Sequence, residues 1–187
     1  MNERDKHLIR SLKPNVTKDE ALRTFRAPGP SFLYWRLRTG PLQRIAEAYV
    51  PFRLYRVAYA MTKEKAQRIF AMDAVDGSLD LFEFRAVPQE EELVTVHTRN
   101  CLTGTLSEER AQEVLRDKVL RIVFQQGFFK LRETSLEIEA LPGEIHLPYW
   151  LGFYGASSAL RCRVMDAVRR RLEGGKASAF FEQWLAA

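Results

Sequence analysis

The chain has 187 residues, of which 46% are hydrophobic and 28% charged, with a net charge of +5. This composition is typical of a folded globular protein and excludes a disordered or fibrous chain. Two cysteines are too few for a disulfide scaffold, and no apolar run approaches the roughly 18 residues needed to span a bilayer. The first residues lack the apolar stretch of a secretory signal, so the sequence predicts a cytoplasmic protein without membrane attachment.

Charge is distributed unevenly along the chain. Residues 1–86 contain 16 Lys and Arg against 10 Asp and Glu, whereas residues 87–187 contain 13 against 14. A basic first half is the electrostatic footprint expected for an acidic partner such as nucleic acid, and it is equally compatible with an ordinary solvated surface. Weak nucleic-acid binding through this half is therefore an alternative function.

The first half begins with a helix signal followed by strand signals. Thr17-Lys-Asp-Glu20 has the spacing of a capping box and predicts a helix through about Phe25, which Pro28-Gly-Pro30 ends. Asp76-Gly77 is a strong hairpin signal, because glycine adopts positive φ without a Cβ clash. Strands are predicted at about 31–38, 49–60, 67–75 and 79–84.

The second half shows a similar order of elements. Thr105-Leu-Ser-Glu108 matches a capping box and predicts the longest helix, ending near Gly127. Strands are predicted at 135–140, 145–154 and 160–168, with Pro142-Gly143 as a turn and another strand at 93–97 after the boundary segment 88–92. A final amphipathic helix is predicted from a stripe of apolar residues at helical spacing, namely Ala177, Phe180, Phe181, Trp184 and Leu185.

A tetrapeptide occurs in both halves. Met72-Asp-Ala-Val75 lies 21 residues after Pro51, and Met165-Asp-Ala-Val168 lies 17 residues after Pro148. The sequence therefore predicts an α+β fold of tandem duplicated αβββ units with antiparallel sheets, plus the C-terminal amphipathic helix. The two repeats are placed at residues 1–87 and 93–187, as separate domains or fused in one compact domain.

Each half resembles the PepSY-type α+β repeat. The resemblance rests on the helix starts at Thr17-Lys-Asp-Glu-Ala21 and Ser107-Glu-Glu-Arg-Ala111, the Pro-aromatic strands, and the strands ending in Asp-Ala-Val. Asp73-Ala-Val-Asp-Gly77 resembles the Asp-x-x-x-Gly hairpin of that family, whereas Asp166-Ala-Val-Arg-Arg170 lacks the glycine. The resemblance implies a non-catalytic binding or regulatory module.

The repeated aspartates Asp73 and Asp166 lie on apolar strand faces. A carboxylate there is costly to bury unless it is hydrogen-bonded, so each is predicted to accept backbone N–H groups of a neighbouring turn. A paired catalytic or metal site is the alternative. Two copies of one carboxylate in a duplicated framework favour the structural role.

Binding residues are predicted on the aromatic strands. Rings next to cations can stack on bases or ring-bearing ligands, although rings on strands more commonly form a core. The predicted binding residues are Arg53, Tyr55, Arg56, Tyr149 and Trp150.

Signatures of catalysis are absent from the sequence. It contains no phosphate-binding glycine loop, nucleophile elbow or zinc-protease motif, and His97 and Cys101, with His146 and Cys162, do not have the spacing of a zinc site. We expect a non-enzymatic module, without cofactor or metal, that recognises a protein or small ligand through its sheet or terminal helix. An enzyme using Asp73, Asp166 or the His97/Cys101 pair is a further alternative. The sequence also allows a homodimer that forms through Phe180, Phe181 and Trp184.

Overall fold

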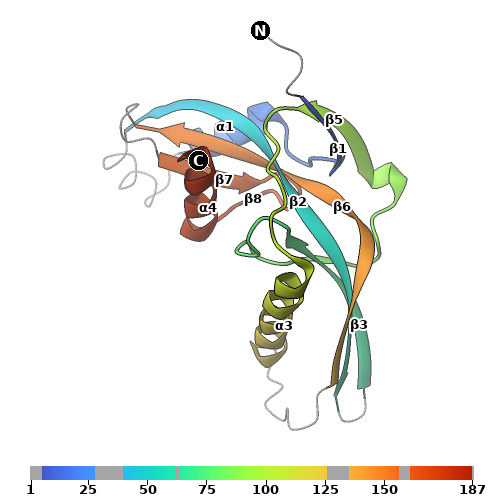
Figure 1. Ribbon diagram of the computed structural model, residues 1–187. Coiled ribbons are helices and arrows are strands. Elements are labelled where there is room, and N and C mark those ends of the chain that lie inside the picture. Colours follow the sequence, from blue (N-terminus) through green and yellow to red (C-terminus); the bar gives the residue numbers. More distant parts are fainter. Residues whose placement is uncertain (1–5, 28–39, 62–63, 126–134, 156–160, 187) are drawn as a thin grey trace. The chain divides into compact units, whose positions relative to one another are not determined.

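The computed structural model describes residues 6–27, 40–61, 64–125, 135–155 and 161–186 (Figure 1). Within these ranges the backbone forms three α-helices, a 3-10 helix and eight strands. In chain order they are β1 (His7–Leu12), α1 (Lys18–Arg26), β2 (Leu42–Met61), β3 (Glu64–Asp73), β4 (Phe82–Phe84), η2 (Glu90–Glu92), β5 (Leu93–Thr98), α3 (Glu108–Gln125), β6 (Ser135–Tyr154), β7 (Arg161–Asp166), β8 (Arg171–Leu172) and α4 (Gly175–Ala186). None of the described helices is both long and apolar enough to cross a membrane.

The strands belong to one mixed sheet. They are hydrogen-bonded in the order β4-β3-β2-β6-β1-β5, with β7 paired to β6 and β8 to β7. The predicted α+β class is confirmed. The expected antiparallel pairing is found for most strand pairs, but β1 meets β6 in parallel at Ser11 and His146, so the sheet is mixed.

The chain divides into two compact units. Unit 1 comprises residues 1–50, 93–102 and 146–187, and unit 2 comprises residues 51–92 and 103–145. Each unit combines segments from both predicted sequence halves, and the long strands β2 and β6 contribute residues to both units.

Unit 2 is built around α3, which packs on β2 and β3 (Figure 1). Ala111, Leu115 and Val119 recur every four residues, so they share one helix face, and all three are fully buried. They meet alternate residues of the strands, which also share a face. The strand residues of this core are Tyr55, Val57, Tyr59, Phe70 and Met72.

Unit 1 places α1 against β6 and β7. The predicted capping box is confirmed, since Thr17 and Glu20 hydrogen-bond reciprocally at the helix N-terminus. Ala21 and Phe25 lie one turn apart and are buried with Tyr154. The Phe25 ring covers the backbone of Gly152, where an added Cβ would lie 2.9 Å from Phe25 Cγ.

Helix α4 confirms the predicted terminal helix and completes the core of unit 1. Phe181 is fully buried, and its ring centroid lies 5.4 Å from that of Tyr149 and 6.3 Å from that of Trp184. Phe180 is also buried by the chain itself, whereas Leu185 is 47% exposed. The predicted homodimer through Phe180, Phe181 and Trp184 gains no support from this packing.

Three local expectations are corrected by the structure. Thr105 does not form a capping box with Glu108, because α3 begins at Glu108 and Ser107 accepts the N–H of Arg110 instead. Pro142-Gly143 does not end a strand, since β6 runs through it with Gly143 at φ +90°. The strand expected at 79–84 is reduced to Phe82–Phe84.

Other strand expectations have mixed outcomes. The strand after the boundary segment is confirmed as β5. Strand β1 was not predicted, and it pairs along its whole length with β5, far away in the sequence. The strand expected at 31–38 lies outside the described residues.

Candidate functional site

In unit 2, a buried carboxylate holds the turn that follows β3. Asp73 is fully buried, and its Oδ1 accepts the N–H groups of Asp76 (3.1 Å) and Gly77 (2.9 Å), while Oδ2 accepts that of Leu79 (2.9 Å). Gly77 has φ +70°, a conformation that suits glycine. Burial raises the pKa of the Asp73 carboxyl, and the three N–H donors oppose that shift. All these partners are backbone groups of one turn.

The same turn is joined to the start of α3. The N–H of Thr105 donates to Ala74 O (2.8 Å), and its hydroxyl donates to Val75 O (2.7 Å). Two residues later Ser107 caps the helix. The threonine that the sequence suggests as a cap therefore connects the helix to the turn.

Arg53 of β2 lies at this junction. Its Nη1 donates to Leu106 O (2.8 Å), and its Nε donates to Glu144 Oε1 (3.0 Å). Glu108 lies 3.5 Å from Nη1 and also accepts a long hydrogen bond from the Tyr55 hydroxyl. Burial and the Glu108 charge raise the pKa of Tyr55 to about 12, so its phenol stays protonated at neutral pH. The Arg53 guanidinium is thus held by one carbonyl and two carboxylates.

Unit 1 has a second buried carboxylate at the end of β7. Asp166 is 1% exposed, and its Oδ1 accepts the N–H groups of Val168 (2.8 Å) and Arg169 (2.7 Å). The Arg169 guanidinium lies 3.6 Å from Oδ2. Burial raises the pKa of the Asp166 carboxyl, and Arg169 opposes the shift.

This second turn is joined to the start of α1. Asn15 donates from its backbone N–H to Ala167 O (2.8 Å) and from its side chain to Val168 O (2.8 Å). Trp150 Nε1 donates to Val16 O (3.1 Å). Helix α1 then begins after its cap, Thr17, two residues beyond Asn15.

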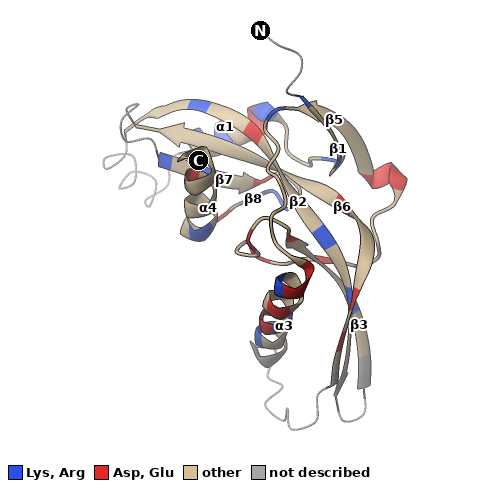
Figure 2. Cartoon of the chain, in the orientation of Figure 1, with Lys and Arg blue, Asp and Glu red and all other residues tan. Residues whose placement is uncertain are grey.

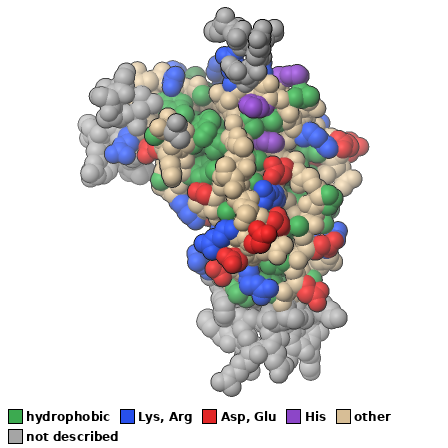
Figure 3. Space-filling view, viewed as in Figure 1, with side chains coloured by type: hydrophobic (Ala, Val, Ile, Leu, Met, Phe, Trp, Pro, Cys, Tyr) green, Lys and Arg blue, Asp and Glu red, His purple; other side chains and the backbone are tan. Residues whose placement is uncertain are grey.

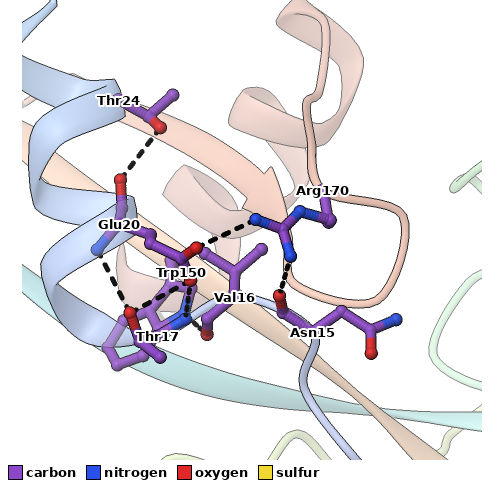
Figure 4. Close-up of polar contacts among 7 residues, drawn as sticks. All are labelled: Asn15, Val16, Thr17, Glu20, Thr24, Trp150 and Arg170. Carbon is purple, nitrogen blue, oxygen red and sulfur yellow. Dashed lines mark hydrogen bonds and ion pairs between the residues drawn. The ribbon is translucent and has the colours of Figure 1, made fainter.

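Arg170 links the turn after β7 to the residues at the start of α1 (Figure 4). It donates to Asn15 O (2.7 Å) and to Glu20 (2.9 Å), and Glu20 also accepts the N–H of Thr17 (2.8 Å). Arg170 itself has φ 58°, an unusual value for a residue other than glycine. The Arg169–Arg171 run thus has carboxylate partners at each position, with Arg171 bonded to Glu173.

The two junctions share a set of contacts. In each, the residue after the aspartate donates its N–H to a proline of the neighbouring strand, Ala74 to Pro51 (2.8 Å) and Ala167 to Pro148 (3.1 Å). In each, the residue two positions before the helix cap, Thr105 or Asn15, makes two hydrogen bonds to carbonyl groups of the turn. A strand side chain, Arg53 or Trp150, donates to the carbonyl of the residue directly before the cap. A helix from one sequence half thus meets a strand end from the other half in both units.

The predicted binding residues divide between the two units, with Arg53, Tyr55 and Arg56 in unit 2 and Tyr149 and Trp150 in unit 1. Tyr55 is fully buried in unit 2, and Tyr149 is 5% exposed in unit 1. Arg53 contacts two glutamates, and Arg56 pairs with Glu139 at 2.6 Å. The rings therefore serve the cores.

The cysteines and histidines form no metal cluster among the residues that the structure describes. Cys162 is buried, and desolvation together with Glu182 raises its thiol pKa to about 12, which suppresses the reactive thiolate. Cys101 donates to Leu102 O (3.3 Å), and His97 is exposed on β5. The three histidines of the chain, His7, His97 and His146, gather on one face of the molecule (Figure 3).

The most exposed apolar positions near these histidines lie on β1 and β5. All six residues of β5 pair with β1, and among the described strands β5 has no second neighbour. Leu8 is 64% exposed and Val94 is 36% exposed. The sequence predicts a strand here but not its position at the edge of the sheet. The run Leu93-Val-Thr-Val-His-Thr98 is rich in β-branched residues and lacks Pro and Gly, which favours a strand that can accept a further strand.

Comparison with models of protein families, with curated proteins and with solved structures gives no match to this chain. The resemblance to the PepSY-type repeat therefore stays a prediction. The geometry of the described residues carries the functional argument.

Proposed function

We propose that this chain is a non-enzymatic binding module that recognises an extended segment of a partner protein at the open edge of β5. The observation that carries the proposal is a six-residue strand that pairs only with β1 among the described strands, with exposed apolar residues on it and on β1. An open edge offers main-chain N–H and C=O groups to another strand, and the flanking side chains select the sequence.

The composition of β5 supports this role. Natural sheet edges are usually protected by Lys, Pro or short length. Residues 93–98 include neither Lys nor Pro, and β5 carries no charged Lys, Arg, Asp or Glu (Figure 2). The other ends of the sheet are shorter, since β4 has three residues and β8 has two. The edge of β5 is therefore the best template for strand addition among those described.

The alternative functions receive less support. For an enzyme, Asp73 and Asp166 would have to act on a substrate, yet their oxygens accept backbone N–H groups of their own turns. For nucleic-acid binding, the arginines of the first half would have to face phosphates. Arg53, Arg56 and Arg68 instead pair with glutamates.

The proposal is tested with peptides selected for binding from a random displayed library. Val94→Lys is expected to weaken the selected peptides by about tenfold or more, since a charge at the apolar edge opposes strand addition. The matched control is Leu185→Lys, at another exposed apolar residue on α4. Affinities are measured by fluorescence anisotropy, after thermal melts establish that both variants fold.

Amide hydrogen exchange gives a second readout for the same peptides. Bound peptide should slow exchange along residues 93–98 because their outward N–H groups gain partners. Peptides that bind equally well to Val94→Lys and leave β5 exchange unchanged would contradict the proposal.

We further propose that the two halves descend from a duplicated unit and that each compact unit pairs the helix of one half with the strand ends of the other. The shared contacts of the two junctions support this arrangement. Asn15 and Thr105 occupy corresponding positions, because each bonds a turn twice two residues before a helix cap.

Exchange of these two residues tests their correspondence. Asn15→Thr and Thr105→Asn should each change the free energy of unfolding by less than about 1 kcal/mol, because either side chain can donate to the turn carbonyl. Asn15→Ala and Thr105→Ala should each cost about 1 kcal/mol. Chemical denaturation measures all four; exchange variants as unstable as the alanine variants would argue against correspondence.

A further inference from the structure

The β1–β5 ribbon carries basic side chains and no acidic ones. Residues 6–12 and 93–102 include Lys6, Arg10 and Arg99 together with His7 and His97, and neither segment contains Asp or Glu. All five of these side chains are exposed. The field along this edge is therefore positive and favours a negatively charged ligand.

The strand register sorts the ribbon's side chains into two faces. On one face Leu8 lies opposite His97 and Arg10 opposite Thr95; on the other, Ile9 lies opposite Val96. Ser11 lies opposite Val94 on that second face. Because side chains alternate along a strand, the first face carries the basic residues Arg10 and His97 together with the exposed Leu8, and the second presents the valines.

From these two faces we infer that the partner segment alternates acidic and apolar residues. This inference rests on the proposed edge binding. A strand added to β5 continues both faces, so its residues on the first face lie beside Thr95 and His97, with Arg10 one strand further away on β1. Those on the second face lie beside Val94 and Val96, which are the partly exposed residues of a face that is otherwise buried at Ile9, Ser11 and Thr98. Carboxylates on the first face and apolar side chains on the second complement the ribbon.

The charge along the chain also favours one end of the edge. Glu90–Glu92 immediately precede β5, whereas Arg99 immediately follows it. Acidic residues of the partner are therefore attracted most strongly near Thr98 and Arg99. Exposed charge pairs weaken with salt, so the affinity falls as ionic strength rises.

The experiment uses the full chain and three short labelled peptides. These alternate valine with glutamate, with threonine or with lysine, and binding is followed by fluorescence anisotropy at low and at physiological ionic strength. The Val/Glu peptide is expected to bind at least about tenfold more tightly than the Val/Lys peptide, because like charges repel at an interface. Its affinity should fall with salt.

Charge variants locate the binding on the ribbon. Arg10→Glu combined with Arg99→Glu should reverse the preference between the Val/Glu and Val/Lys peptides, and the neutral pair Arg10→Gln with Arg99→Gln should reduce it. Arg116→Glu, at an exposed residue of α3 in unit 2, is the matched control and should leave the preference unchanged. Circular dichroism checks that each variant is folded.

The outcomes separate this inference from the proposed function. Equal or tighter binding of the Val/Thr or Val/Lys peptide, lost in Val94→Lys, would overturn the acidic partner while leaving edge binding intact. Binding of none of the three peptides would overturn the inference, and library peptides sensitive to Val94→Lys would still support the edge. Single-stranded nucleic acid that outcompetes the Val/Glu peptide at physiological salt would also overturn it.

Discussion

Replacement of Asp73 by alanine is expected to lower the free energy of unfolding by about 3–5 kcal/mol. The variant leaves three backbone N–H groups of the turn without their acceptor, and a buried donor without a partner costs about 1–3 kcal/mol. Water that enters the turn hydrogen-bonds to some of these N–H groups, so the expected loss of stability is smaller than three full penalties. Urea denaturation followed by circular dichroism measures the effect.

The controls for Asp73 separate a structural carboxylate from a catalytic one. Asp76→Ala removes one exposed hydrogen bond to the Ser78 N–H and should cost less than about 1 kcal/mol. Asp166→Ala, at the corresponding turn of unit 1, should cost about 2–4 kcal/mol because two N–H groups and Arg169 lose their acceptor. A stable Asp73→Ala protein would contradict the structural role and revive the enzymatic alternative.

Phe25→Ala is expected to destabilise the protein by about 3–5 kcal/mol, the usual cost of truncating a buried phenylalanine. The ring is fully buried between α1 and the strands of unit 1, and it covers Gly152. Gly152→Ala should cost about 1–3 kcal/mol through overpacking, since its Cβ would lie 2.9 Å from the ring. Denaturation curves of both variants give these values.

The two positions should be coupled. In the Phe25→Ala background the ring is gone, so Gly152→Ala should cost close to nothing, and the coupling should exceed about 1 kcal/mol. Gly174→Ala serves as the control glycine, because an added Cβ there meets nothing within 4 Å. Additive effects of Phe25→Ala and Gly152→Ala would show that the contact does not limit packing.

Elements with local determinants were predicted well from the sequence. Helix α1 was placed by Thr17, Glu20 and the spacing of its buried residues, all within a few turns of chain. Helix α4 followed from its apolar stripe. These signals act over i, i+3 and i+4 distances, so they need no knowledge of distant segments.

Elements that depend on distant partners were predicted less well. Strand β1 pairs with β5 at Leu12 and Leu93, about eighty residues apart, and neither segment alone indicates that pairing. Pro142-Gly143 has turn chemistry, yet Gly143 adopts positive φ inside the continuous strand β6. The strand continues through this dipeptide, so the tertiary context outweighed the local preference.

The predicted site residues show the same difference between local and long-range determinants. The sequence predicted backbone-bonded carboxylates at Asp73 and Asp166, and the contacts of both residues have that form. For the strand aromatics it left two interpretations, a core and a binding surface, and the structure packs Tyr55 under α3 and Tyr149 against α4. Whether a strand aromatic is exposed depends on which helix packs over it, which is a long-range property.

By itself the sequence determined the α+β class, the helix starts that are locally capped, and the repeated Met-Asp-Ala-Val segments. Only the tertiary structure decided that each unit takes its helix and its strand ends from different halves, and that β5 pairs only with β1 among the described strands. The physical reason is that capping and periodicity are local interactions, whereas strand neighbours and side-chain burial depend on contacts between residues far apart in the chain.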